Sequence, residues 1–122
     1  ERYGEFKVQR LPSVNQDDKL LVNPRQGVKL EELKKAINDL FCPQTGQVPE
    51  TAVLFFAGHG WRESGHGETE GYLVTSDARP TEELWGLSLK WLRQVLDESP
   101  VRQQIIWLDC CHSGELFNFA QE

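Results

Sequence analysis

The sequence predicts an α/β fold in which a mostly parallel sheet is flanked by helices. Two short apolar runs, residues 51–57 and 105–108, have the composition of buried strands. An amphipathic helical pattern precedes each run, at residues 28–41 and again after Ser88. Strands that alternate with helices along a chain are typical of a parallel sheet with helices on its faces.

The first third of the chain contains one clear helix. Residues 5–11 alternate polar and apolar side chains, which predicts a strand with one covered face. Residues 12–24 are polar with scattered turn formers, and we expect a loop there. In residues 28–41 the apolar side chains recur at helical spacing, so this helix packs on the core and ends before Pro43.

The remaining elements follow the first buried strand, residues 51–57. Residues 61–71 are rich in glycine and are expected to form a loop before a short strand at 72–74. Ser88 is a suitable N-cap for a second helix, which Ser99 and Pro100 end. The second buried strand begins near Val101, and a third helix is expected from Ser113. The apolar face of the second helix is formed by Leu89, Leu92, Val95 and Leu96.

Composition limits the classes of function. The chain has 122 residues, which suits one domain over 1–122, and a net charge of -6, which argues against nucleic acid as a partner. Its longest apolar run, residues 52–57, is too short to cross a membrane. Three cysteines, two of them adjacent, do not make a disulfide framework, so we expect reduced thiols and a cytoplasmic location. A first residue other than methionine predicts a fragment or a processed chain.

Reactive side chains follow both buried strands. His59 stands between two glycines just after the first strand, and Cys111 comes just after the second. Parallel sheets place functional groups beyond the carboxyl ends of their strands, so the two side chains are expected to share one crevice. An imidazole beside a thiol is the arrangement of a cysteine nucleophile activated by a histidine base. Taken singly, such a histidine is more often structural, and such a cysteine a small buried hydrophobic residue. Cys110 should point the opposite way along the strand, and we interpret it as a packing residue.

Three motifs resemble those of one peptidase family. Residues 55–60 (Phe-Phe-Ala-Gly-His-Gly) and 109–114 (Asp-Cys-Cys-His-Ser-Gly) are similar to the two active-site motifs of the metacaspase and orthocaspase branch of the caspase-like peptidases. Residues 70–78 resemble the strand and turn between them. The resemblance covers most of 28–117. It implies a caspase-like (caspase-haemoglobinase) fold and the large-subunit catalytic domain of a protease made as a zymogen with autocatalytic processing.

The resemblance also implies a role for each site residue. Cys111 would attack the scissile carbonyl as a thiolate, and His59 would protonate the leaving amine. The amides of Gly60 and Cys111 would form the oxyanion hole. Asp109 would bind the substrate residue before the cut, which implies cleavage of protein substrates after Arg or Lys. An alternative for Asp109 is a cap on the following helix.

The sequence departs from the family pattern in three ways. Ala57 replaces a serine that lines the specificity pocket in many metacaspases, which leaves one hydrogen bond fewer for the substrate. The acidic pair of calcium-dependent members is absent at residues 86–90, and Asn118 replaces another acidic ligand. We therefore expect no cofactor and no calcium requirement. The family fold has further strands before and after these residues, so remaining strands or a small subunit of the same parent protein are expected partners. Glu68, Glu70, Glu82 and Glu83 are a weaker cation-binding cluster, better explained as a solvated face.

Other classes of function stay open. The same residues suit a non-catalytic caspase-like interaction or scaffold module. Separase-type and CHAT-type peptidases share the His-Gly motif but usually lack the second one. A metal site is a third alternative, although adjacent ligands do not fit the usual zinc spacing. Its candidate ligands are His59, His66, Cys110, Cys111 and His112.

Overall fold

Two parallel strands, β5 (Thr51–Ala57) and β9 (Gln103–Asp109), form the central sheet. The computed structural model describes residues 2–3, 6–11, 13–16, 19–22, 27–65 and 67–110. β5 and β9 pair in step, from Thr51 opposite Gln103 to Ala57 opposite Asp109. The start of the pairing is fixed by a hydrogen bond of 3.0 Å from the Gln103 amide to the Glu50 carbonyl. The two predicted strands and their parallel arrangement are confirmed, but only one face of each strand is turned away from solvent.

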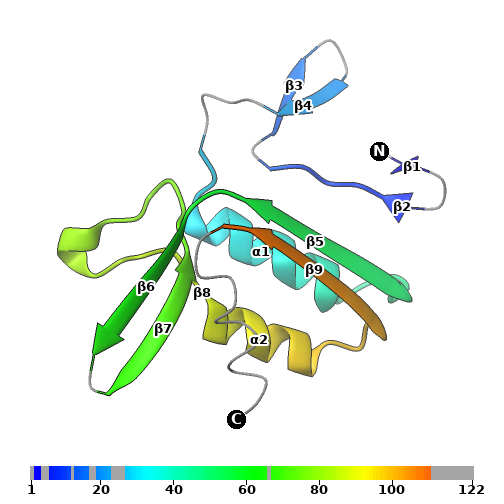
Figure 1. Cartoon of the computed structure of the whole chain (residues 1–122). Helices are drawn as coiled ribbons and strands as arrows, with labels where there is room; N and C mark the ends of the chain where they lie inside the picture. The colour runs from blue at the N-terminus through cyan, green and yellow to red at the C-terminus, as the bar shows by residue number, and fades with distance from the viewer. Residues whose placement is uncertain are drawn as a thin grey trace.

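Helices α1 (Leu30–Phe41) and α2 (Leu89–Glu98) pack together with β5 and β9 in one hydrophobic core (Figure 1). Burying each large apolar side chain stabilises the fold by about 1.5–3 kcal/mol. Ser88 caps α2 as predicted, because its hydroxyl accepts a hydrogen bond of 3.3 Å from the Trp91 amide. The helix side of the core consists of Leu33, Ile37, Phe41, Leu89, Leu92, Val95 and Leu96.

A second, antiparallel sheet follows the central one. It contains β6 (Gly60–Gly65), β7 (Glu68–Leu73) and β8 (Leu87–Ser88), and a short 3-10 helix, η1 (Pro80–Glu82), lies between β7 and β8. The prediction of a loop over 61–71 is wrong, because these residues form most of a β-hairpin. Glycines and charged side chains hide the alternation there, whereas the pairing uses backbone groups that every residue carries. Of the short strand predicted at 72–74, Tyr72 and Leu73 are the end of β7, and Val74 follows that strand.

The close approach of β7 and β8 depends on Gly86. Its φ of 128° lies in a region that favours glycine, and a Cβ atom there would lie 2.2 Å from the Leu73 carbonyl oxygen. A residue without a side chain therefore lets the chain pass β7 before it enters β8 and α2.

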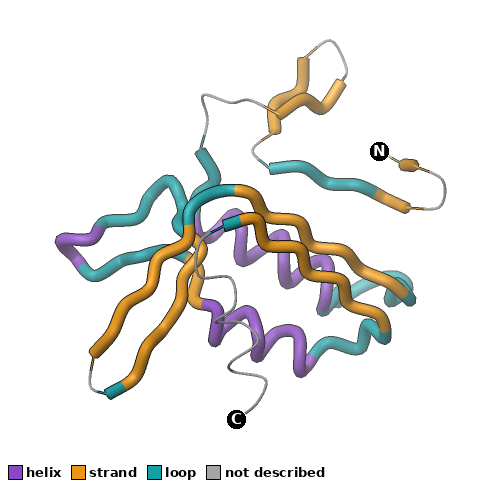
Figure 2. Tube along the Cα trace, viewed as in Figure 1, coloured by secondary structure: helices purple, strands orange, loops and turns teal. Residues whose placement is uncertain are grey.

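The N-terminal segment contains two small hairpins (Figure 2). One pairs β1 (Arg2–Tyr3) with β2 (Phe6–Lys7), and the other pairs β3 (Ser13–Gln16) with β4 (Lys19–Val22). The predicted strand at 5–11 is therefore correct only at β2, and the loop predicted over 12–24 is wrong where β3 and β4 pair. A two-stranded ribbon is held by backbone hydrogen bonds, which composition does not reveal. The helix predicted from Ser113 lies outside the described residues.

One face of the central sheet remains open to solvent. Val53 and Phe55 on β5 are 44% and 58% exposed, and Ile105 and Trp107 on β9 are 51% and 65% exposed. Phe55 and Trp107 make an edge-to-face contact with ring centroids 5.7 Å apart. Parallel sheets are normally covered on both faces. Within the described residues nothing covers this face of the β5–β9 sheet.

Among the described helices, none combines the length and apolarity that a membrane span requires.

The N-terminus of α1 is capped from a distant turn. The Asp77 carboxylate accepts hydrogen bonds from the Leu30 amide at 3.1 Å and from the Thr75 hydroxyl at 2.8 Å. The bond from Thr75, together with that from Leu30, holds the pKa of Asp77 below its ordinary value of 3.8, against the opposing effect of burial. The turn after β7 is thereby joined to the first helix.

This cap predicts a pH-dependent contribution to stability. Because the folded-state pKa of Asp77 is lowered, its stabilisation is complete above the unfolded-state value and is lost as the pH falls through the folded-state pKa. Between pH 5 and pH 3, the wild type should therefore lose more free energy of unfolding than Asp77→Asn. Urea titrations at both pH values measure this difference. Asp39→Asn is the matched control, since Asp39 pairs with Lys35 on the surface at 2.7 Å. An equal acid response of the wild type and Asp77→Asn would contradict the assignment.

Candidate active site

The carboxyl end of the central sheet brings three of the predicted site residues together. Ala57 ends β5 and Asp109 ends β9, and they are direct partners in the parallel register. Neighbouring strands lie about 4.8 Å apart, and paired residues project to the same face. Both residues are exposed, on the same face as Phe55 and Trp107. His59 follows two residues after Ala57.

The backbone around His59 is held from two sides. The Gly58 amide donates to the Asp109 carbonyl at 3.3 Å, and the Val74 amide donates to the His59 carbonyl at 2.9 Å. His59 therefore lies where the parallel sheet meets the β6–β7 hairpin, and it is exposed. Its neighbour Gly60 opens β6 opposite Leu73. An imidazole that is open to solvent can exchange protons with a bound substrate.

The two cysteines at the end of β9 differ in what the structure describes. Cys110 is partly buried and packs against the hydrophobic core. That environment agrees with a packing role. Cys111 is the next residue and lies outside the described residues, as do His66 and His112. The prediction that Cys111 and His59 face one another therefore stays a prediction.

Two of the acidic residues considered for cation binding have separate partners, and the side chain of Glu68 lies outside what the structure describes. Glu70 accepts a hydrogen bond of 2.6 Å from Ser88, and Glu82 lies 3.7 Å from Arg79. Glu83 is exposed, with a φ of 58°. Over the described ranges, no group of three metal-ligating side chains converges.

The structure contains a stacked tryptophan pair near His59 that the sequence analysis did not include in the site. Trp61 stacks on Trp85 with ring centroids 5.0 Å apart and ring planes at 13°, and Trp61 is 43% exposed. The Trp61 indole donates to the Glu63 carboxylate at 3.0 Å. The available signal was the position of Trp61 two residues after His59. The stacking partner, Trp85, could not be predicted from the sequence, because the chain comes back to Trp61 only through η1 and the strained Glu83.

Comparison with known proteins identifies the family. A family model described as the caspase domain matches residues 5–121, which is nearly the whole chain. The chain belongs to the caspase domain family. No curated protein and no solved structure matched it. The match, together with parallel β5 and β9 and the helices beside them, confirms the predicted caspase-like α/β fold. Membership supports a cysteine peptidase that acts on proteins.

Proposed function

We propose that this caspase domain is a cysteine endopeptidase of the metacaspase or orthocaspase branch that cleaves after Arg or Lys. The observation that carries the proposal is the in-step pairing of β5 and β9, which puts Asp109 and the His59 segment at one edge of the sheet. Cys111 is joined to that edge through Cys110. The family match supports the same chemistry.

The reaction uses a dyad of Cys111 and His59. The Cys111 thiolate attacks the scissile carbonyl carbon, and the carbonyl electron pair moves onto oxygen. The amides of Gly60 and Cys111 stabilise this oxyanion, an effect of about 3 kcal/mol for a donor. The C–N bond then breaks as His59 protonates the leaving amine. Water hydrolyses the thioester, releases the new carboxyl group and restores the thiol.

Asp109 is the residue that selects a basic substrate. It is exposed at the end of β9, and among the described residues no Lys or Arg pairs with its carboxylate. A substrate guanidinium or ammonium group that docks there supplies the missing positive charge. Ala57 lies beside it on β5 and offers no hydroxyl, so recognition depends on the charge of Asp109 more than on hydrogen bonds from its neighbour.

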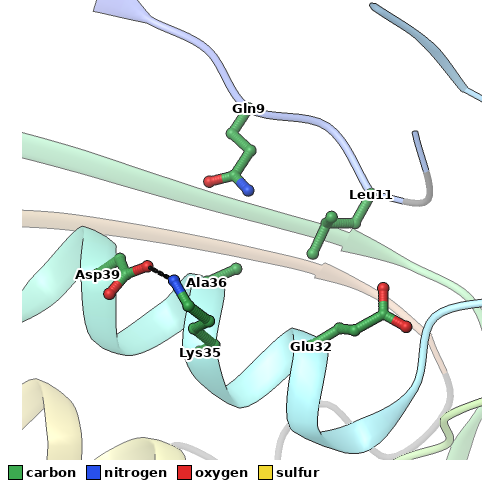
Figure 3. Close-up of a pocket in the computed structure, with 6 residues that line it drawn as sticks. All are labelled: Gln9, Leu11, Glu32, Lys35, Ala36 and Asp39. Carbon is green, nitrogen blue, oxygen red and sulfur yellow. Dashed lines mark hydrogen bonds and ion pairs between the residues drawn. The ribbon is translucent and has the colours of Figure 1, made fainter. Parts of the chain in front are cut away.

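We propose that this domain, 1–122, works with further polypeptide of its parent protein. The solvent-exposed face formed by Val53, Phe55, Ile105 and Trp107 suits additional helices, and β5 pairs with no described strand other than β9. A groove of about 190 Å³ separates residues 9–11 from α1 (Figure 3). Remaining strands or a small subunit, produced by autocatalytic processing of a zymogen, are the proposed partners.

The proposed reaction needs no cofactor. A thiolate and an imidazole supply both the nucleophile and the acid, so neither a metal nor calcium enters the chemistry. Cys42 is a free thiol in the described part of the chain, in keeping with the proposed cytoplasmic compartment.

A panel of fluorogenic peptides tests the specificity. Peptides that differ only in Arg, Lys or Asp before the cut should give kcat/KM values at least about 100-fold higher for Arg and Lys, because an unpaired charge in a site costs about 3 kcal/mol or more. The full-length protein is assayed after any processing is complete. A preference for Asp would contradict the role of Asp109. No hydrolysis of any peptide would favour the interaction module.

A further inference from the structure

We propose that the face of the second sheet next to His59 binds a second basic side chain of the substrate, apart from the one before the cut. This inference rests on the proposed function. We call this surface the aromatic–acidic face. It consists of Trp61, Glu63, Glu70, Tyr72 and Trp85.

The antiparallel register puts these side chains on one side of the sheet. Trp61 is paired with Tyr72, and Glu63 with Glu70. Directly paired residues share a face, and residues two apart on a strand do as well. Arg62 lies between Trp61 and Glu63 and so belongs to the opposite face.

The aromatic part of the face offers an exposed indole ring. Trp61 is 43% exposed although it stacks on Trp85, so the pair leaves indole surface accessible to a ligand. Stacking on Trp85 and the hydrogen bond from Trp61 to Glu63 fix the orientation of this ring. A rigid, exposed tryptophan is the preferred partner for a cation over its face.

The acidic part of the face favours a positively charged partner. The Glu63 carboxylate is held 3.0 Å from the Trp61 indole nitrogen, and Glu70 accepts a hydrogen bond from Ser88. The pKa of Tyr72 is raised to about 12, by burial first and then by a hydrogen bond to Glu70 and the negative charges of Glu70 and Glu63. Arginine fits better than lysine, since its planar group stacks on an indole while it donates to a carboxylate.

The spacing between His59 and Trp61, which lies at the start of β6, sets the position of this second side chain. Trp61 lies two residues from His59, which is about 7 Å in an extended strand at about 3.3 Å per residue. A substrate bound in extended form has the same rise. The second basic residue therefore lies about two positions from the cleaved bond.

Paired peptides test the inference in the full-length protein. All carry Arg before the cut, and they differ in Arg, Ala or Glu two positions away on either side. Arg at one of these positions should raise kcat/KM about fivefold over Ala. Trp61→Ala should bring this ratio close to one, Trp61→Phe should keep part of it, and Val48→Ala, at a 44% exposed apolar side chain outside both sheets, should leave it unchanged.

A binding measurement separates this inference from the proposed function. Peptides with one or two Arg residues are titrated into the Cys111→Ala variant, and affinity is followed by tryptophan fluorescence. The peptide with two Arg residues should bind more tightly than the peptide with one, and this difference should disappear in a Cys111→Ala/Trp61→Ala double variant. That result supports the aromatic–acidic face even if no peptide is cleaved. Cleavage after Arg without any preference at the second position, or a preference that survives Trp61→Ala, overturns it.

Discussion

Replacement of Cys111 by alanine is expected to lower kcat by about 10⁴-fold or more, because removal of a nucleophile leaves only the contribution of binding and oxyanion stabilisation. The adjacent Cys110→Ala is the matched control. Cys110 packs against the core, so its removal should cost some stability but leave most of the turnover. Steady-state kinetics on an Arg peptide, with thermal melts of each variant, measure both effects.

Covalent labelling gives an independent readout of the same assignment. A fluoromethyl ketone that carries arginine should alkylate Cys111, and mass spectrometry of the digested protein identifies the modified residue. If Cys110→Ala loses activity and Cys111→Ala keeps it, the nucleophile is Cys110. If neither thiol is labelled after processing, the domain is a non-catalytic module.

Asp109→Asn is expected to reduce kcat/KM for Arg and Lys peptides by roughly 10²-fold, since removing one partner of a charge pair typically costs 2–5 kcal/mol. Asparagine keeps the shape and removes the charge. The loss should therefore be much smaller for a peptide with a neutral residue before the cut. Asp97→Asn is the control, because Asp97 pairs with Arg93 on the surface of α2 at 3.2 Å.

The alternative role of Asp109, a cap on the helix that follows, predicts a different pattern. A lost cap would lower the melting temperature and reduce activity on every peptide by the same factor. A uniform loss across the panel would therefore assign Asp109 to stability and reopen the question of specificity.

The elements that the sequence predicts well are those that bury a continuous apolar pattern. The α1 helix was expected at 28–41 and spans Leu30–Phe41, and the apolar run at 51–57 is β5. Ser88 could be predicted as a cap because a hydroxyl before an apolar periodic segment has few other uses. In each case local periodicity and core packing favour the same structure.

The hairpins were missed for a physical reason. In β6 and β7, the exposed face carries aromatic and acidic side chains, so polarity does not alternate in the usual way between inside and outside. The tip contains Gly67, whose φ of 80° permits a tight reversal. Such a hairpin is held by cross-strand pairing, which depends on what lies beside each strand.

The candidate site was predictable in part. That His59 and Asp109 belong to neighbouring strand ends follows from the pattern of the chain. That Ala57 pairs directly with Asp109 does not, because the register depends on the lengths of α2 and of the turn before β9. The pairing of Trp61 with Trp85 is equally non-local, since the chain returns through η1 before the two rings meet.

The length of the turn between α2 and β9 fixes the register of β9 against β5, and with it the side to which Asp109 points. The Ser99 hydroxyl bonds to the Phe41 carbonyl and accepts from the Val101 amide at 3.1 Å, and two residues later the ladder with β5 begins. Deletion of one residue here would shift the register of β9 against β5 by one residue, so that the Asp109 side chain would point toward the helices. Natural insertions and deletions should therefore accumulate at the tip of the β6–β7 hairpin, while the short stretch 99–102 keeps a constant length.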